Sequence, residues 1–270
     1  MYKKLNKFIN LSIAFIILLF LLNMDDKELY FSTLLSIYND DPTKTLVVIL
    51  FFIVSNIFLA LFWVNLGTDE NKNKELSNWL ISNIGKYTPI KVGSIILRIN
   101  NTNNSKNKIE AFKNIAIEQF LLVLQGVSIV FFVFIKINSN YKIILIIFYF
   151  FGFNYLIKKL FSKINLTSYL YLLHVGLILN LVGISIFLES TEYTRFFDLA
   201  TIYIVSSSLS ILIFFIPAGL IVREGLFIYL SKELLDISNL VFIALSLRIL
   251  YILTDFILLF IGLAIKKYYK

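Results

Sequence analysis

The sequence predicts an all-α, polytopic membrane protein with about 7–8 transmembrane helices. Of its 270 residues, 59% are hydrophobic and the mean hydropathy is +0.83, which is more apolar than a soluble domain of this size. Long runs without charged residues recur along the chain. Two stretches, about 77–98 and 217–235, interrupt this pattern with proline, glycine and basic residues, and we interpret them as broken or re-entrant segments.

The charge-free runs define the expected helices. A helix needs roughly 20 residues to cross the hydrocarbon, and about 17–25 are workable. Five of the six runs reach that length, and the fourth does so if Lys142 and Lys158 extend their head groups to the interface. The runs are 8–24, 45–68, 119–135, 143–157, 164–188 and 199–222. The corresponding spans after the first are expected at about 45–66, 111–135, 141–157, 166–188 and 198–216.

The distribution of charge predicts the orientation. Three lysines precede the run 8–24, but no small-residue cleavage site follows it, so we expect a retained first span rather than a signal peptide. The positive-inside bias then places the N-terminus in the cytoplasm. The abundance of Ile, Asn, Lys and Phe is typical of AT-rich bacterial genomes. We therefore expect a multi-pass protein of the bacterial cytoplasmic (inner) membrane, whose net charge of +8 reflects basic loops near anionic lipid rather than nucleic-acid binding.

The C-terminal part leaves two alternatives open. A final apolar helix, about 236–265, ends in lysines and should finish in the cytoplasm, which requires that 218–235 also cross; the alternative is that one span is miscounted. We treat 1–270 as a single integral-membrane domain. Pro89 and Pro217 occupy matching places in the two halves, which fits an internal pseudo-repeat of about 1–160 and 161–270. Two unrelated kinks are the other interpretation.

Arginines in or beside apolar sequence are the candidate functional residues. An arginine at the centre of a bilayer costs about 2.5–3.5 kcal/mol, so it needs a counter-charge or a function. Residues seven apart share a helix face, as Arg248 and Asp255 do, whereas the adjacent Arg223 and Glu224 point in different directions and are not expected to neutralise each other. The arginines are Arg98, Arg223 and Arg248, and their candidate counter-charges are Glu118, Glu224 and Asp255.

This set of charges predicts a cavity for an anionic headgroup. Guanidinium groups bind phosphate oxygens two at a time, and helix N-termini at the breaks would add backbone donors. The expected ligand is a phospholipid or a polyprenyl phosphate. The alternative is that the arginines extend to the interface and meet lipid phosphate there, an interpretation strongest for Arg98, because hydrophilic residues follow it at once.

Other chemistry is not indicated. The chain has no cysteine, and its single histidine, His174, lies inside a predicted span, where we interpret it as a hydrogen-bonded core residue rather than a proton relay. Gly85 and Lys86 lack the preceding glycine of a phosphate-binding loop. No metal-ligand spacing and no nucleophile elbow occurs. We expect no cofactor, no metal and no enzymatic activity.

The two interrupted stretches resemble the integral-membrane family named after the transmembrane domain of lysylphosphatidylglycerol synthase, also called flippase-like proteins. The family pattern runs G-K-Y-x-P-G-K-V-G with a later R, then a glutamate early in the next span, then P-G-G-L-G-x-R-E and a final arginine. Ile90, Ala218 and Ile221 depart from it at positions that are usually glycine. The matching residues are Gly85, Lys86, Tyr87, Pro89, Lys91, Val92, Gly93, Arg98, Glu118, Pro217, Gly219, Leu220, Arg223, Glu224 and Arg248.

The resemblance implies movement of lipid headgroups between leaflets for cell-envelope biogenesis. Its implied substrate-binding residues are those of the two blocks together with Glu118 and Arg248, and its implied partners are anionic membrane lipids and envelope or glycan-biosynthesis enzymes. The chain ends at its last predicted helix, so we expect no soluble aminoacyl-transferring domain. Two alternatives stay open. One is a membrane enzyme or accessory subunit of glycan or lipid modification with Glu118 or Glu224 as general base. The other is a scaffold for an envelope complex.

Overall fold

The computed structural model describes residues 41–67, 71–87, 92–100, 105–134, 149, 152–155, 157, 159, 169–189, 196–212 and 222–268. Every secondary-structure element in these ranges is a helix, which confirms the all-α class for this part of the chain. In chain order the elements are α3 (Pro42–Leu66), α4 (Lys72–Ser82), the 3-10 helix η1 (Asn83–Tyr87), α5 (Val92–Asn100), α6 (Ser105–Phe134), α8 (Leu170–Glu189), α9 (Phe196–Ile211), α10 (Val222–Ser231) and α11 (Ile237–Tyr268).

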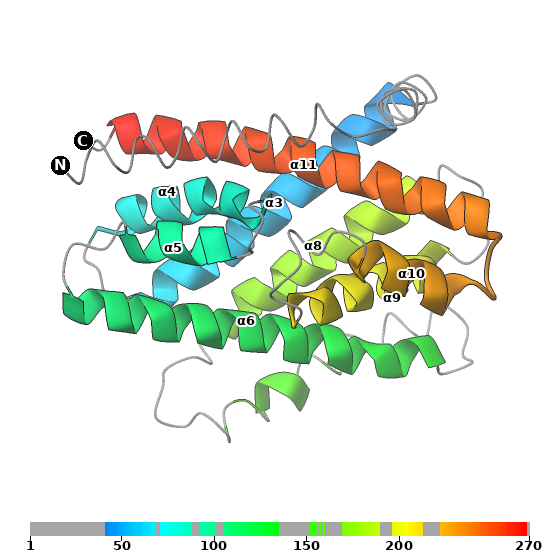
Figure 1. Cartoon of the computed structure of the whole chain (residues 1–270), viewed down its shortest axis with the longest axis horizontal. Helices are drawn as coiled ribbons and strands as arrows, with labels where there is room; N and C mark the ends of the chain where they lie inside the picture. The colour runs from blue at the N-terminus through cyan, green and yellow to red at the C-terminus, as the bar shows by residue number, and fades with distance from the viewer. Residues whose placement is uncertain are drawn as a thin grey trace.

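The helices form one bundle. Figure 1 shows α11 and α6 running lengthwise along opposite edges of the view, with α4 and α5 towards one end and α9 and α10 towards the other. Helix α3 packs on α8, α4 and α11, whereas α9 packs on α6, α8 and α10. Residues of α3 contribute to all three clusters of buried apolar side chains, so α3 is the helix around which the described core is built.

Three described helices are long and apolar enough to cross a membrane. They are α3, the segment Leu170–Leu188 of α8, and α11, and the shorter α9 is apolar as well. Large apolar side chains on α11, among them Leu253, Phe260 and Leu263, are exposed, as expected for a helix that faces lipid. The chain is thus a helical protein of membrane-spanning character, and the fuller count of about 7–8 crossings stays a prediction.

The expected helix positions agree with those described. The predicted spans 45–66, 111–135, 166–188 and 198–216 and the final helix 236–265 correspond to α3, α6, α8, α9 and α11. The N-terminal span at 8–24 lies outside the described residues, and so does most of the span predicted at 141–157. Local chemistry explains where α3 begins: Asp41 accepts a hydrogen bond from the backbone N–H of Lys44 at 3.0 Å, and Pro42 fixes the first helical φ.

The first interrupted segment is broken, as predicted. Helix α4 tightens into η1, and α5 begins five residues after η1 ends. Gly85 allows the two to pack closely, because a Cβ at this position would lie 2.5 Å from the backbone nitrogen of Ser94. The hairpin of α4, η1 and α5 contacts α11 through α4 and η1, and α6 through α5.

The second interrupted segment contains a short helix, α10, which packs on α9 and α11. Its 10 residues rise about 15 Å, roughly half of the hydrocarbon thickness. A complete crossing by 218–235 would therefore depend on 213–221, which lie outside the described residues. In both halves an apolar helix (α3 or α9) precedes an interrupted segment and a long helix (α6 or α11) follows it. This order is compatible with the internal pseudo-repeat, which stays a prediction.

Candidate functional site

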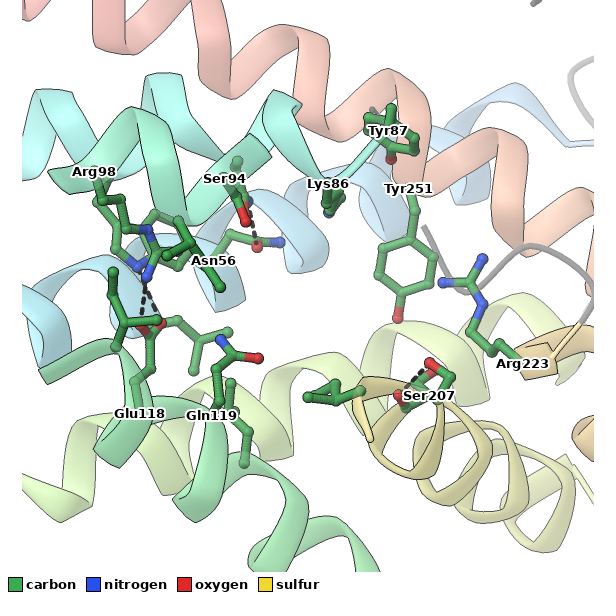
Figure 2. Close-up of a pocket in the computed structure, with 18 of the residues that line it drawn as sticks. Asn56, Lys86, Tyr87, Ser94, Arg98, Glu118, Gln119, Ser207, Arg223 and Tyr251 are labelled. Carbon is green, nitrogen blue, oxygen red and sulfur yellow. Dashed lines mark hydrogen bonds and ion pairs between the residues drawn. The ribbon is translucent and has the colours of Figure 1, made fainter. Parts of the chain in front are cut away.

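The two interrupted segments meet at a cavity of about 270 Å³. Figure 2 shows Arg98 and Glu118 at one end of it and Arg223 and Tyr251 at the other. Its lining comes from α3, α4, η1, α5, α6, α9, α10 and α11, so both halves of the chain contribute. The described lining residues are Asn56, Leu59, Trp79, Asn83, Lys86, Tyr87, Ser94, Ile95, Arg98, Ile115, Glu118, Gln119, Leu122, Ser207, Ser210, Ile211, Arg223, Arg248 and Tyr251.

Arg98, in the last turn of α5, is buried and has both polar and aromatic contacts. Its Nη1 donates to Glu118 on α6, and its Nε donates to the Ser82 hydroxyl at 3.0 Å. Its guanidinium lies 5.0 Å from the ring of Trp63 and 5.1 Å from that of Trp79, within cation–π range. Trp79 in turn donates its indole N–H to Glu118 at 3.1 Å. Arg98 is 7% exposed and paired with Glu118, which argues against the alternative that its head group meets lipid phosphate.

Arg223 and Arg248 share a single carboxylate. Arg223 donates to Glu224 Oε1 through Nη2 at 2.8 Å and through Nε at 3.1 Å. The Nη1 atom of Arg248, on α11, lies 3.3 Å from the same oxygen. The guanidinium of Arg223 also faces the rings of Tyr203 and Tyr251 at 5.3 and 5.7 Å. These contacts tie α10 to α9 and α11 beside the cavity.

Two predicted charge pairings are wrong. Arg223 and Glu224 do neutralise each other, because the long, flexible arginine stem turns its head group back to a neighbour whose Cβ points elsewhere. Asp255, expected to pair with Arg248, instead forms an ion pair with Lys86 at 2.7 Å. The shared helix face of Arg248 and Asp255 was a correct inference from spacing, but η1 packs on α11 and supplies the nearer cation.

Asp255 anchors η1 to α11. Besides the ion pair with Lys86, it accepts a hydrogen bond from the Tyr87 hydroxyl and a longer one, at 3.4 Å, from the Asn83 side chain. Asn83 also reaches Asn56 on α3 at 3.4 Å. The Asp255 side chain is 1% exposed and that of Lys86 is 35% exposed, so the carboxylate is buried while its lysine partner is partly exposed.

Neutral polar side chains complete the lining, and the sequence analysis did not predict them as site residues. They are Asn56, Asn83, Ser94, Gln119, Ser207 and Ser210. On α9, Ser207 and Ser210 are three residues apart and therefore share a face. The sequence signal that could have found this face is the run of serines at 206–208 and 210 inside an otherwise apolar helix.

The structure places seven of the eleven predicted site residues. Lys86, Tyr87, Arg98, Glu118, Arg223 and Arg248 line the cavity, and Glu224 contacts two of these residues. The remaining four lie outside the described residues: Pro89, Lys91, Pro217 and Gly219.

His174 lies in a separate, buried polar cluster. Its Nδ1 is 2.6 Å from the Gln125 side-chain nitrogen and its Nε2 is 3.0 Å from Asn154 Oδ1. This is the hydrogen-bonded core arrangement that we expected from its position within a span. No group of three metal-ligating side chains occurs among the residues that the structure describes.

Comparisons of the chain with protein-family models, with curated proteins and with solved structures found no match. The resemblance to the lysylphosphatidylglycerol synthase transmembrane family therefore stays a prediction based on the sequence motifs.

Proposed function

We propose that this protein binds the anionic headgroup of a membrane lipid in the cavity and moves it between the two leaflets. The observation that carries the proposal is the convergence of Arg98, Arg223 and Arg248, from three different helices, on one cavity. Buried arginines are costly in a membrane, and a set of them around a cavity suits a ligand that brings negative charge.

The contrast between the cavity and the outside of the bundle supports a lipid rather than a water-soluble anion. Helices α3 and α11 carry exposed apolar side chains such as Leu46, Leu50 and Phe260, which would face acyl chains. The cavity, by contrast, is lined in part by charged and polar side chains. A lipid bound there would place its headgroup in the cavity and leave its tails in the surrounding bilayer, as expected for a site between broken helices.

The enzymatic alternative has less support. It requires Glu118 or Glu224 as a general base, and both carboxylates are already engaged by arginine donors. A general base must be positioned to take up a substrate proton, whereas each of these carboxylates is held in an ion pair with arginine. The geometry thus favours binding and translocation over proton abstraction.

Reconstitution tests the proposal. Purified protein is inserted into vesicles that contain a headgroup-labelled fluorescent anionic phospholipid, and a membrane-impermeant quencher reports how fast inner-leaflet lipid becomes accessible. We expect the wild type to accelerate exposure and Arg248→Ala to abolish the acceleration. Lys113→Ala, which removes an exposed cation from α6 away from the cavity, is the matched control and should behave as wild type. Equal rates for Arg248→Ala and wild type would rule out the proposed function.

A further inference from the structure

The charges around the cavity are distributed unevenly. At one end, Arg98 is paired with Glu118, and each partner is buried. Near the middle, Lys86 is paired with Asp255. Each of these pairs contains one cation and one anion, so neither leaves a net charge for a ligand.

The third group is different, because two arginines share one carboxylate. Arg223 and Arg248 both approach Glu224 through the same oxygen, Oε1, at 2.8 and 3.3 Å. The group therefore carries one positive charge that the described residues do not balance. The other carboxylate oxygen, Oε2, is buried without a hydrogen-bond partner in the described part of the chain.

The donors of the arginines are also used unequally. Arg98 donates hydrogen bonds through Nη1 to Glu118 and through Nε to Ser82. Its guanidinium group also lies against the rings of two tryptophans. Arg248 lines the cavity too, but among the described residues its one polar contact is the ion pair with Glu224. A guanidinium carries five N–H donors, so Arg248 retains most of its capacity for a ligand.

We infer that Glu224 is a specificity-determining residue that sets the charge of the ligand. By balancing one of the two arginines, it leaves the site matched to a headgroup with a single negative charge, such as a phosphodiester, whose oxygens bind Arg248 and Arg223. A phosphomonoester carries about −1.5 to −2 at pH 7 and is poorly matched, as is a diphosphate. Arg98 is then a positioning residue that holds α5 against α6. This inference rests on the proposed function.

The size and lining of the cavity agree with a small phosphodiester headgroup. A volume of about 270 Å³ corresponds to about nine water molecules at their liquid volume. A phosphate with a short polar substituent fits that space, and the Gln119 amide and the Ser207 hydroxyl line it and can hydrogen-bond an uncharged substituent.

Lipids with identical acyl chains test the inference, since only the headgroup then differs. Binding of phosphatidylglycerol, phosphatidic acid and phosphatidylcholine to the purified protein is measured by native mass spectrometry. We expect the wild type to bind phosphatidylglycerol more tightly than either of the other two. Glu224→Gln adds one positive charge to the site, and it should shift the affinity ratio at least about tenfold towards phosphatidic acid, equivalent to about 1.4 kcal/mol. Glu233→Gln, an exposed carboxylate outside the cavity, should leave the ratio unchanged.

The results of this experiment distinguish a failure of the proposed function from a failure of the inference about Glu224. If wild type does not distinguish phosphatidylglycerol from phosphatidylcholine, the proposed function fails. If it does distinguish them but prefers phosphatidic acid, or if Glu224→Gln leaves the ratio unchanged, only the inference about Glu224 is overturned. Should the variant not fold, wild type alone decides: lowering the pH from about 8 to about 5 converts phosphatidic acid to a monoanion, and its affinity relative to phosphatidylglycerol should rise. A constant or falling relative affinity would contradict the inference.

Discussion

The buried ion pair between Arg98 and Glu118 allows a quantitative prediction about stability. Their side chains are 7% and 2% exposed. Removing one partner of such a pair leaves an uncompensated buried charge and costs about 3–5 kcal/mol, whereas replacing both by apolar groups of similar volume is often nearly neutral. We therefore expect Arg98→Met and Glu118→Met each to lower the free energy of unfolding by about 3–5 kcal/mol. The double variant should be more stable than either single variant.

The two tryptophans of the chain provide the assay. Trp63 and Trp79 are its only tryptophans, and both rings lie against the Arg98 guanidinium. Their fluorescence, followed as sodium dodecyl sulfate is added to protein in mixed micelles, reports unfolding at the ion pair itself. The four proteins of the cycle then give the coupling energy between the two side chains.

A substitution at an exposed position of the same helix serves as the control. Lys108→Met removes an exposed cation from α6 and should change stability by no more than about 0.5 kcal/mol. If the effects of Arg98→Met and Glu118→Met add within about 0.5 kcal/mol, the two side chains are not coupled. The reasoning that makes Arg98 a positioning residue would then be refuted.

Further predictions concern the close helix contacts and the anchor of η1. Gly85→Ala should destabilise the protein by about 1–3 kcal/mol, because its Cβ would meet backbone at 2.5 Å, whereas Gly152→Ala, with no atom within 4 Å of its Cβ, should be tolerated in the same unfolding assay. Gly126→Ala places a Cβ 1.8 Å from the Ser208 hydroxyl oxygen, so it should destabilise the α6–α9 contact, and Ser208→Gly should restore much of the loss; no rescue would argue against that contact. Asp255→Asn removes the buried charge that binds η1 to α11 and should increase proteolysis near η1, whereas unchanged cleavage would contradict this anchoring role.

The length of the apolar runs was enough to predict the long apolar helices that the structure describes. The segments that form α3, α8 and α11 are long and mostly apolar, and their ends carry polar or charged residues, so burial in hydrocarbon leaves little choice of structure. The same reasoning predicted that arginines within apolar sequence would lie in a cavity rather than against the hydrocarbon. Arg98, Arg223 and Arg248 do share one cavity.

Which charged side chains form ion pairs with each other could not be predicted from the sequence. Which cation reaches Asp255 depends on how η1 packs against α11, and Lys86 and Asp255 are far apart in the chain. Likewise, the pairing of Arg223 with its neighbour depends on the rotamer of a long side chain and on the tyrosines that flank it. The neutral lining residues could not be assigned to the cavity from the sequence. A serine in a helix does not indicate whether it lies on the face that the neighbouring helices leave open.

The central claim is that both interrupted segments line one cavity, and a cross-linking measurement tests it most directly. The chain has no cysteine, so Ser94→Cys on α5 and Ser207→Cys on α9 can be introduced together without background thiols. We predict that a short bifunctional thiol reagent cross-links this pair in membranes and that an anionic phospholipid slows the cross-linking. A control pair of Ser207→Cys with the exposed Lys232→Cys should react singly without being cross-linked. Thiols that each react singly but never cross-link would contradict the account.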